Sequence, residues 1–317
     1  MPSSCTVDVL TDMLARSSAR GAAFAHSTVR GDRGVRFPAG PGLAVHAIVD
    51  GEVHAWAHDP DASIRLAPGD LVLVRDSVEH QLGRRAGAPC VALGQLLGTG
   101  SRRGAARRLT VGSPADGPAA EFFCGAYLFE GDLFRPLLEA LPEMVHLRPT
   151  AGSTLRETMD LLAREMGRDE PGQQTLLDRL LDVALVQVLR EHFRAHDASA
   201  PAWFRAMSDP PIAAALRALH GDPSHPWTVG ELADEASLSR AAFARRFSAR
   251  LGVAPLSYLT DWRMALARER LRDTDDRLAA IAASIGYASE FSFAAAFKRH
   301  HGTAPGRWRL ATRTSDV

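Results

Sequence analysis

Long apolar stretches are absent from this sequence of 317 residues, and no run approaches the roughly 18 residues that a membrane-spanning helix needs. Residues 1–8 lack a basic segment followed by an apolar core, so we expect no secretory signal peptide and a cytoplasmic location. The three cysteines (Cys5, Cys90 and Cys124) have no CxxC spacing, which argues against a disulfide framework.

Signatures of the common enzyme classes are also missing. The sequence contains no Walker A loop, no GxGxxG fingerprint, no GxSxG turn and no HExxH helix. In enzymes these motifs provide phosphate cradles, dinucleotide sites, activated serines and metal-bound water. We therefore expect a protein that is not an enzyme.

Lysine is nearly missing, since Lys298 is the single lysine among 37 basic residues. The formal net charge is zero, but the charges are unevenly distributed. Residues 1–200 carry 21 basic against 25 acidic side chains, whereas residues 237–313 carry 14 against 6, a net charge of +8. A basic segment on a mildly acidic remainder indicates an anionic partner for that segment alone.

The pattern of residues predicts β structure first and helices later. Residues 1–20 have the spacing of a short amphipathic helix, and the stretch up to residue 130 holds short β-prone runs between glycine and proline clusters. The runs are 43–49, 53–57, 63–66, 71–74, 91–97 and 120–129. Many short strands of this kind are typical of an antiparallel sandwich or barrel.

Helical periodicity predicts two amphipathic helices within residues 131–195, separated by Pro171 and Gly172. One face of the first helix carries Leu155, Met159, Leu162 and Met166, and one face of the second carries Leu176, Leu180, Val183 to Leu185, Val188 and Leu189. These faces must pack either on the sheet or on a second copy of the chain. Residues 196–211 have the composition of a linker with one short helix, and residues 212–313 are predicted to be all helical.

A helix-turn-helix pattern opens this C-terminal segment. Thr228 and Glu231 form a capping box at one short helix, and Ser239 caps the next. Phe243 and Phe247 mark the buried face of that second helix.

The same pattern recurs about fifty residues later, where Phe293 and Phe297 repeat the four-residue spacing. Each copy ends in Gly-x-x-Pro, from Gly252 to Pro255 and from Gly302 to Pro305. Two such units joined by one rigid helix can reach successive major grooves on one face of DNA, about 34 Å apart.

Residues 212–313 resemble the DNA-binding domain of the arabinose-regulator (AraC/XylS) family of bacterial transcription factors. The residues that carry the resemblance are Leu232, Ala233, Ser239, Phe243, Arg245, Phe247, Gly252, Pro255, Tyr258, Leu259, Trp262, Arg263, Met264, Ala267, Leu271, Ile281, Ala282, Gly286, Tyr287, Ser289, Glu290, Phe293, Phe297, Lys298, Arg299, Gly302 and Pro305. The resemblance implies a DNA surface made of Ser239, Arg240, Ala241, Ala244, Arg245 and Arg246 in the first unit, and of Ser289, Glu290, Phe291, Ser292, Ala295, Lys298 and Arg299 in the second.

One position departs from the family pattern. Ala295 stands where the family often has arginine, so the second unit offers no long polar side chain in the middle of its helix. We expect this unit to contribute mainly phosphate contacts, through Lys298, Arg299 and Arg307, together with methyl packing.

Residues 7–130 resemble a cupin, and more narrowly the cupin-type sensor half of some members of this family. The resemblance is carried by His46, Gly51, Pro68 to Val74, Glu79, His80, Cys124 and Gly125, and it extends to Leu141 and Pro142. Cupins often hold a metal, but the usual His-x-His pair is absent here. His46, His80 and Cys124 could still form a site for zinc or a similar divalent ion, with His54 and Cys90 as substitutes. A small-molecule effector could instead contact His46, Trp56 and His80, with Phe37 and Leu43 as further lining, or all of these could be ordinary core residues.

The expected fold class is α+β, with an N-terminal cupin-like antiparallel β-barrel followed by helices and a C-terminal all-α domain with two helix-turn-helix units. We expect a sensor domain at 1–130, a helical dimerisation segment at 131–195, a linker at 196–211 and a DNA-binding domain at 212–313. The leading hypothesis is a homodimeric regulator of transcription that binds double-stranded promoter DNA under control of a small molecule or metal. Activation, which the resemblance favours, implies contact with RNA polymerase, and no membrane partner is expected. The alternatives are a metal-dependent cupin enzyme with a DNA-binding tail and a ligand-independent DNA-binding protein whose cupin is a scaffold.

Overall fold

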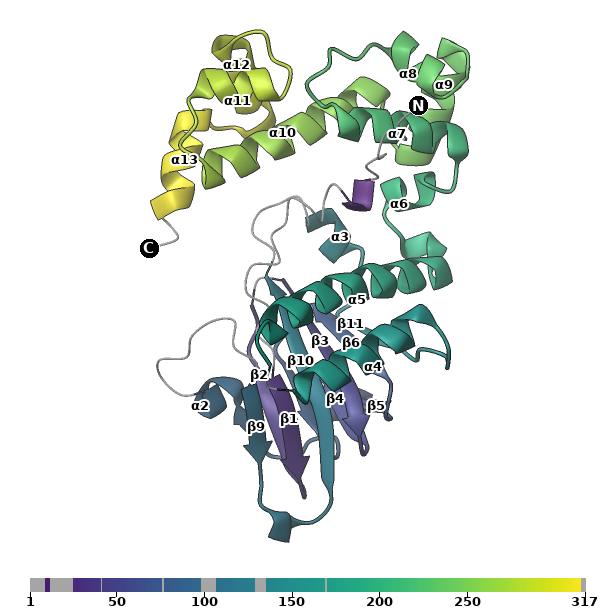
Figure 1. Ribbon diagram of the computed structural model, residues 1–317. Helices are drawn as coiled ribbons and strands as arrows, with labels where there is room; N and C mark the ends of the chain where they lie inside the picture. Colours follow the sequence, from purple (N-terminus) through teal and green to yellow (C-terminus); the bar gives the residue numbers. More distant parts are fainter. Residues whose placement is uncertain are drawn as a thin grey trace. The chain divides into compact units, whose positions relative to one another are not determined.

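The computed structural model describes residues 9–11, 25–40, 42–75, 77–97, 107–128, 135–168 and 170–314. These residues form two compact units (Figure 1). The N-terminal domain lies within residues 17–130 and 137–199, and the C-terminal domain comprises residues 200–314 and also includes residues 9–11, 135 and 136. Residues 9–11 are helical, in agreement with the helix predicted for residues 1–20, and the remainder of that segment lies outside the described residues.

The N-terminal domain is built from two β-sheets. The first sheet has the order β11 (Met144–Leu147), β6 (Leu71–Arg75), β3 (Gly42–Asp50), β10 (Ala119–Leu128), β1 (Ala25–Arg30) and β9 (Arg107–Val111). The second has the order β5 (Ile64–Leu66), β4 (Val53–Trp56), β7 (His80–Gly83), β2 (Gly34–Phe37) and β8 (Cys90–Ala92). Short helices lie between the strands: η1 (Pro60–Ala62), α2 (Leu93–Leu97), η2 (Pro114–Asp116) and α3 (Arg135–Glu139).

The expected cupin-like β fold is confirmed, with two corrections. The two sheets do not close into a single barrel, and two strand pairs, β1 with β9 and β2 with β8, run parallel rather than antiparallel. Buried side chains from both sheets, such as Ile48 and Phe122 from the first and Val35 and Leu82 from the second, form one hydrophobic core. The sheets therefore pack face to face around this core.

Two predicted elements differ from the structure. Residues 91–97 were expected to form one strand, but β8 ends at Ala92 and Leu93 to Leu97 form helix α2, because Gly94 and Gln95 interrupt the run of β-prone side chains. Residues 131–195 are not wholly helical either, since β11 lies within them and pairs with β6 at the edge of the first sheet. The four residues of β11 are fixed by this non-local pairing, which a helical period cannot reveal.

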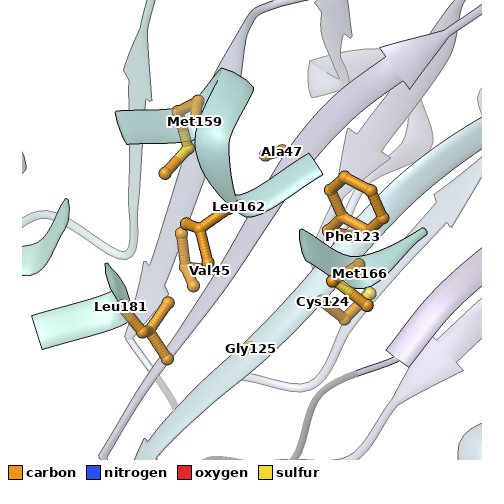
Figure 2. Close-up of a pocket in the computed structure, with 9 residues that line it drawn as sticks. All are labelled: Val45, Ala47, Phe123, Cys124, Gly125, Met159, Leu162, Met166 and Leu181. Atoms are coloured by element: carbon orange, nitrogen blue, oxygen red, sulfur yellow. The ribbon is translucent and has the colours of Figure 1, made fainter. Parts of the chain in front are cut away.

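Helices α4 (Thr154–Met166) and α5 (Gln173–Ala195) form an antiparallel hairpin against the first sheet (Figure 1). Figure 2 shows Met159, Leu162 and Met166 of α4 and Leu181 of α5 over β3 and β10, around a gap of about 20 Å³, which is room for about one water molecule. A Cβ on Gly125 of β10 would lie 3.1 Å from both methyl groups of Leu181. Glycine at this position therefore lets α5 lie close to the sheet.

The C-terminal domain is all helical, as predicted. Its elements are α6 (Ala202–Ala206), α7 (Pro210–Gly221), α8 (Val229–Glu235), α9 (Arg240–Leu251), α10 (Pro255–Asp273), α11 (Leu278–Ser284), α12 (Glu290–His301) and α13 (Pro305–Thr314). The segment predicted as a linker holds η3 (Asp197–Ser199) and the short helix α6. Helix α10 connects two helix pairs, α8 with α9 and α11 with α12 (Figure 1).

Candidate nucleic-acid interface

The first helix pair forms as its capping residues predict. The Thr228 hydroxyl accepts from the Glu231 backbone N–H, and the Glu231 carboxylate accepts from the Thr228 backbone N–H at 2.8 Å. The Ser239 hydroxyl caps α9 by accepting from the Ala242 N–H at 3.3 Å. These caps satisfy backbone donors at both helix starts and define the turn between the helices.

The outer face of α9 carries the residues expected to contact DNA. Phe243 and Phe247 are completely buried and anchor the helix, whereas Arg240, Ala241 and Arg245 are exposed. Ala244 is half-buried. Within the described residues, the guanidinium groups of Arg240 and Arg245 have no hydrogen-bond or ion-pair partner. Both can therefore donate to phosphates or to base edges.

Arg246 has a partner inside the domain. Its Nε donates to Asp209 Oδ2 at 2.9 Å, and Arg250 Nε donates to the same oxygen at 3.0 Å. The Asp209 side chain, at the start of α7, is only 1% exposed. Burial alone would raise the pKa of this carboxyl, but hydrogen bonds from the two arginines lower it overall, so the group stays ionised. Arg246 thus ties α9 to α7, and its contact with DNA remains a prediction.

The second helix pair repeats the first with different outward residues. The Ser289 hydroxyl accepts from the Ser292 N–H at 3.2 Å, and Phe293 and Phe297 are completely buried. The residues that the sequence assigned to DNA contact on α12 are all exposed: Ser289, Glu290, Phe291, Ser292, Ala295, Lys298 and Arg299.

Contacts made by Arg263 of α10 and by Gly286 hold the two helix pairs together. Arg263 donates to the carbonyl oxygens of Pro223 and His225, both at 2.7 Å, just before α8. Gly286, in the turn after α11, has a φ of +80°, and a Cβ there would lie 2.4 Å from the Ser224 carbonyl oxygen. Only glycine fits this contact, which fixes the two pairs against each other. Arg263 and Gly286 both belong to the residues that carry the family resemblance, but the sequence alone indicated no role for either.

The core of the N-terminal domain contains a chain of polar side chains. His46 and Cys124 are direct cross-strand partners on β3 and β10, with Nδ1 and Sγ 2.9 Å apart. His46 Nε2 lies 2.8 Å from His80 Nε2, and His80 Nδ1 lies 3.1 Å from the Val78 carbonyl oxygen. The three residues that the sequence grouped are therefore in contact.

The Val78 carbonyl sets the direction of every hydrogen bond in this row of side chains. Because a carbonyl only accepts, His80 must donate from Nδ1, so His80 Nε2 accepts from His46 Nε2 and His46 Nδ1 accepts from the Cys124 thiol. Burial lowers the pKa of His80 to about 4. Burial, and then the proximity of the His80 ring, also lower the pKa of His46 well below its usual value. Burial raises the pKa of the Cys124 thiol. Burial thus favours the neutral form of all three groups, which agrees with these hydrogen-bond directions.

This arrangement does not suit a shared metal ion. His46 turns one ring nitrogen toward Cys124 and the other toward His80, so the three donor atoms do not converge on one point. Among the residues that the structure describes, no group of three or more His, Cys, Asp or Glu side chains could hold a metal. The substitutes have other contacts, His54 with Ser63 at 3.4 Å and Cys90 with the Ala88 carbonyl oxygen at 3.2 Å. Zinc binding stays a prediction that these contacts do not support.

The residues expected to contact an effector lie in the core. His46, Trp56 and His80 are 1%, 5% and 0% exposed, and Phe37 stacks on His80 with ring centres 5.1 Å apart.

A cleft of about 510 Å³ lies elsewhere in the same domain. It is lined by Glu52, Arg65, Ala67, Pro68, Gly69, Asp70, Arg148, Pro149 and Arg156. Its size suits a small molecule.

Comparison with known protein families agrees with both domains. Residues 8–194 match the Cupin family, and residues 232–311 match a helix-turn-helix domain family. In the described part of the chain, no helix is both long enough and apolar enough to span a membrane.

Several curated proteins are similar along most of the chain. An AraC-like transcription regulator of Streptomyces lividans is 32% identical over 96% of this chain and 98% of its own. The regulator AlkR of Acinetobacter baylyi is 29% identical over 84% of this chain and 87% of its own. Among solved structures, the DNA-binding domain of AdpA in complex with a target DNA is 30% identical over 33% of this chain and 95% of that chain, with a TM-score of 0.32. The chain belongs to the AraC-type family of helix-turn-helix transcriptional regulators and carries a cupin domain before its DNA-binding domain.

Proposed function

We propose that the protein is an effector-responsive activator that binds promoter DNA as a homodimer and reads its sequence mainly through α9. The observation that carries this proposal is the outer face of α9, where Arg240 and Arg245 are exposed and have no partner within the described residues. Arginine is the side chain best suited to a bidentate contact with guanine O6 and N7. A regulator of this kind acts on DNA in the cytoplasm and recruits RNA polymerase.

The proposed homodimer is supported by the outer face of the α4–α5 hairpin. Leu176 and Val183 of α5 are 52% and 46% exposed, and Leu161 of α4 is 43% exposed. Leu180 lies between the first two at helical spacing, so α5 carries an apolar stripe on the side away from the sheet. A second copy would bury this stripe, and the dimer would present four helix-turn-helix units to a repeated site.

Val183→Asp should produce monomers in sedimentation analysis, whereas the same charge at Val253, exposed in the C-terminal domain, should not.

The proposed effector is a small molecule with a carboxylate or phosphate group, bound in the cleft at Arg148 and Arg156. Arg148 donates to buried Asp70 through Nε and Nη2, and Arg156 donates to Asp160 through Nε. The Arg156 guanidinium lies directly over Gly69. Terminal N–H groups of both arginines remain to bind an anion. Arg156 belongs to α4, so an effector here would act directly on the hairpin that we propose as the dimer interface.

The effector site can be tested with a panel of metabolic carboxylates and phosphates. A true effector should raise the thermal midpoint and change DNA affinity in the wild type and in Arg85→Ser, an exposed control in the same domain. It should do neither in Arg148→Ser/Arg156→Ser. Equal effects in all three proteins would place the effector elsewhere.

We do not propose a catalytic role, because His46, His80 and Cys124 hydrogen-bond to one another in the core.

The experiment for the main proposal is selection of binding sites from random duplexes, followed by fluorescence anisotropy in a salt series beside scrambled DNA. The proposal predicts one recurring site that binds more tightly than scrambled DNA at every salt concentration. Equal binding to both duplexes would refute sequence-specific recognition.

A further inference from the structure

The second recognition helix presents an unusual side chain at its start. Phe291, the second residue of α12, is 79% exposed, more than any other large hydrophobic side chain in the described residues. It belongs to neither the Phe293–Phe297 core nor a capping interaction. A single exposed apolar residue is ordinary on a protein surface, so its neighbours decide whether it has a use.

The polar groups around Phe291 are not available for reading bases. The Ser289 hydroxyl accepts from the Ser292 N–H at 3.2 Å, and the Ser292 hydroxyl donates to the Ser289 carbonyl oxygen at 2.8 Å. Glu290 is exposed, but its negative charge is repelled by phosphates. One turn further along, Ala295 is exposed and Ala294 is half-buried, and both offer only methyl groups. Apart from the Glu290 carboxylate, the side chains of α12 that would face base edges therefore offer mainly apolar groups.

The far end of the same helix is basic. Lys298 and Arg299 are exposed in its last turn, followed by His300 and His301. Cationic side chains at this distance from the helix start suit the phosphate backbone that borders a groove. Helix α12 thus has an exposed apolar side chain in its first turn and basic side chains in its last turn, an arrangement that suits a helix placed with its first turn in the major groove.

Only one feature of the major groove is apolar, the C5-methyl group of thymine. We propose that Phe291 is a specificity-determining residue and packs on a thymine C5-methyl group, so that the second unit selects thymine where the first unit selects guanine. This inference rests on the proposed function, because it requires α12 to enter the groove. It gives Phe291 the place in α12 that Ala241 has in α9, fifty residues earlier.

The test replaces each thymine of a selected site by uracil, one at a time. Uracil keeps the base pair and removes only the methyl group. For one thymine in the half-site contacted by α12, the wild-type protein should lose about four-fold in affinity, the value expected for one buried methyl group. Phe291→Ala should bind the thymine and uracil duplexes equally, and Phe291→Leu should keep part of the discrimination.

Leu310→Ala is the matched control, because Leu310 is also strongly exposed, at 71%, but lies on α13. It should discriminate as the wild type does. If wild type and Phe291→Ala respond alike to every thymine while both still prefer the selected site to scrambled DNA, the inference is overturned and the proposed function stands. If the wild type selects no site, the proposed function fails and the inference fails with it.

Discussion

The two recognition helices, α9 and α12, share a scaffold and differ in what they present. Phe243 and Phe247 of α9 correspond to Phe293 and Phe297 of α12, and all four are completely buried. Each helix begins with a serine cap and ends at a glycine with positive φ. The packing requirements of a short helix pair are the same in both units, and so the buried and terminal positions are the same.

The exposed positions have no such requirement, and here the helices diverge. Arg240 and Arg245 of α9 correspond to Glu290 and Ala295 of α12. Conversely, Lys298 and Arg299 of α12 correspond to Ser248 and Ala249 of α9. In α9, Arg246 and Arg250 pair with Asp209, so the arginines without a partner in the described residues, Arg240 and Arg245, lie in its first half. In α12 the exposed Lys298 and Arg299 lie in the last turn. From this difference we expect one scaffold to serve base recognition mainly in the first unit and phosphate contact mainly in the second.

The largest effect is expected from the central arginine of α9. Arg245→Ala should weaken binding to the selected site by about 1–3 kcal/mol and relax the preference at one base pair, because a bidentate contact is lost. Anisotropy on the site and its single-base variants measures both changes. Ala295→Ser, the matched position of α12, should change affinity little. Unchanged binding by Arg245→Ala would remove this arginine from base recognition.

A smaller effect is expected when α9 loses its attachment to α7. Asp209→Asn removes the charge that holds Arg246 and Arg250, and we expect it to lower the free energy of unfolding of the C-terminal domain by about 1 kcal/mol, since both arginines are half-exposed and partly screened by water. Thermal unfolding measures the loss. The control is Asp261→Asn, which removes the exposed partner of His300 on α12. Equal losses in the two variants would contradict the special role of Asp209.

The difference between the two helices can also be reduced by giving α12 the arginine that α9 has at the matched position. Ala295→Arg should create a new guanine preference in the second half-site, with a gain of about 1 kcal/mol or less, because Arg299 and Lys298 already supply phosphate contacts. Site selection with the variant measures the preference. A gain in affinity that is equal for all sequences would show that position 295 faces the backbone instead of the bases.

The smallest effect is expected at the basic end of α12. Lys298→Ala should weaken binding about equally for all sequences and reduce the slope of log affinity against log salt by about 1, because one phosphate contact is lost. Arg85→Ala, which removes a 57% exposed charge from the N-terminal domain, should leave the slope unchanged. A sequence-dependent loss for Lys298→Ala would mean that it reads a base.

The sequence predicted the C-terminal domain far better than the N-terminal one. Caps such as Thr228 and Ser239 act on backbone groups two or three residues away, so a local pattern reveals them. Strands β1, β2, β7, β9 and β11 were not predicted, because they are short or rich in polar residues and exist through pairing with distant strands. The contact of Asp209 with Arg246 is likewise non-local and has no signal in the sequence.

The sequence predicted which polar residues meet in the N-terminal core, but not how they interact there. The family resemblance grouped His46, His80 and Cys124, and the structure brings them together. Which ring nitrogen faces which neighbour depends on the register of β3 and β10 and on the Val78 carbonyl, so a spacing pattern could not distinguish a metal site from a hydrogen-bonded chain.

The most direct test of the difference between the two units is a profile of binding penalties for every single base-pair substitution across the selected site. The half-site contacted by α9 is identified as the one in which the penalty at one base pair disappears in Arg245→Ala. We expect penalties of about 1–3 kcal/mol there, including at a guanine, and smaller penalties in the other half-site. Equal penalties in both halves, with a guanine preference opposite α12, would contradict the proposed difference between the two units.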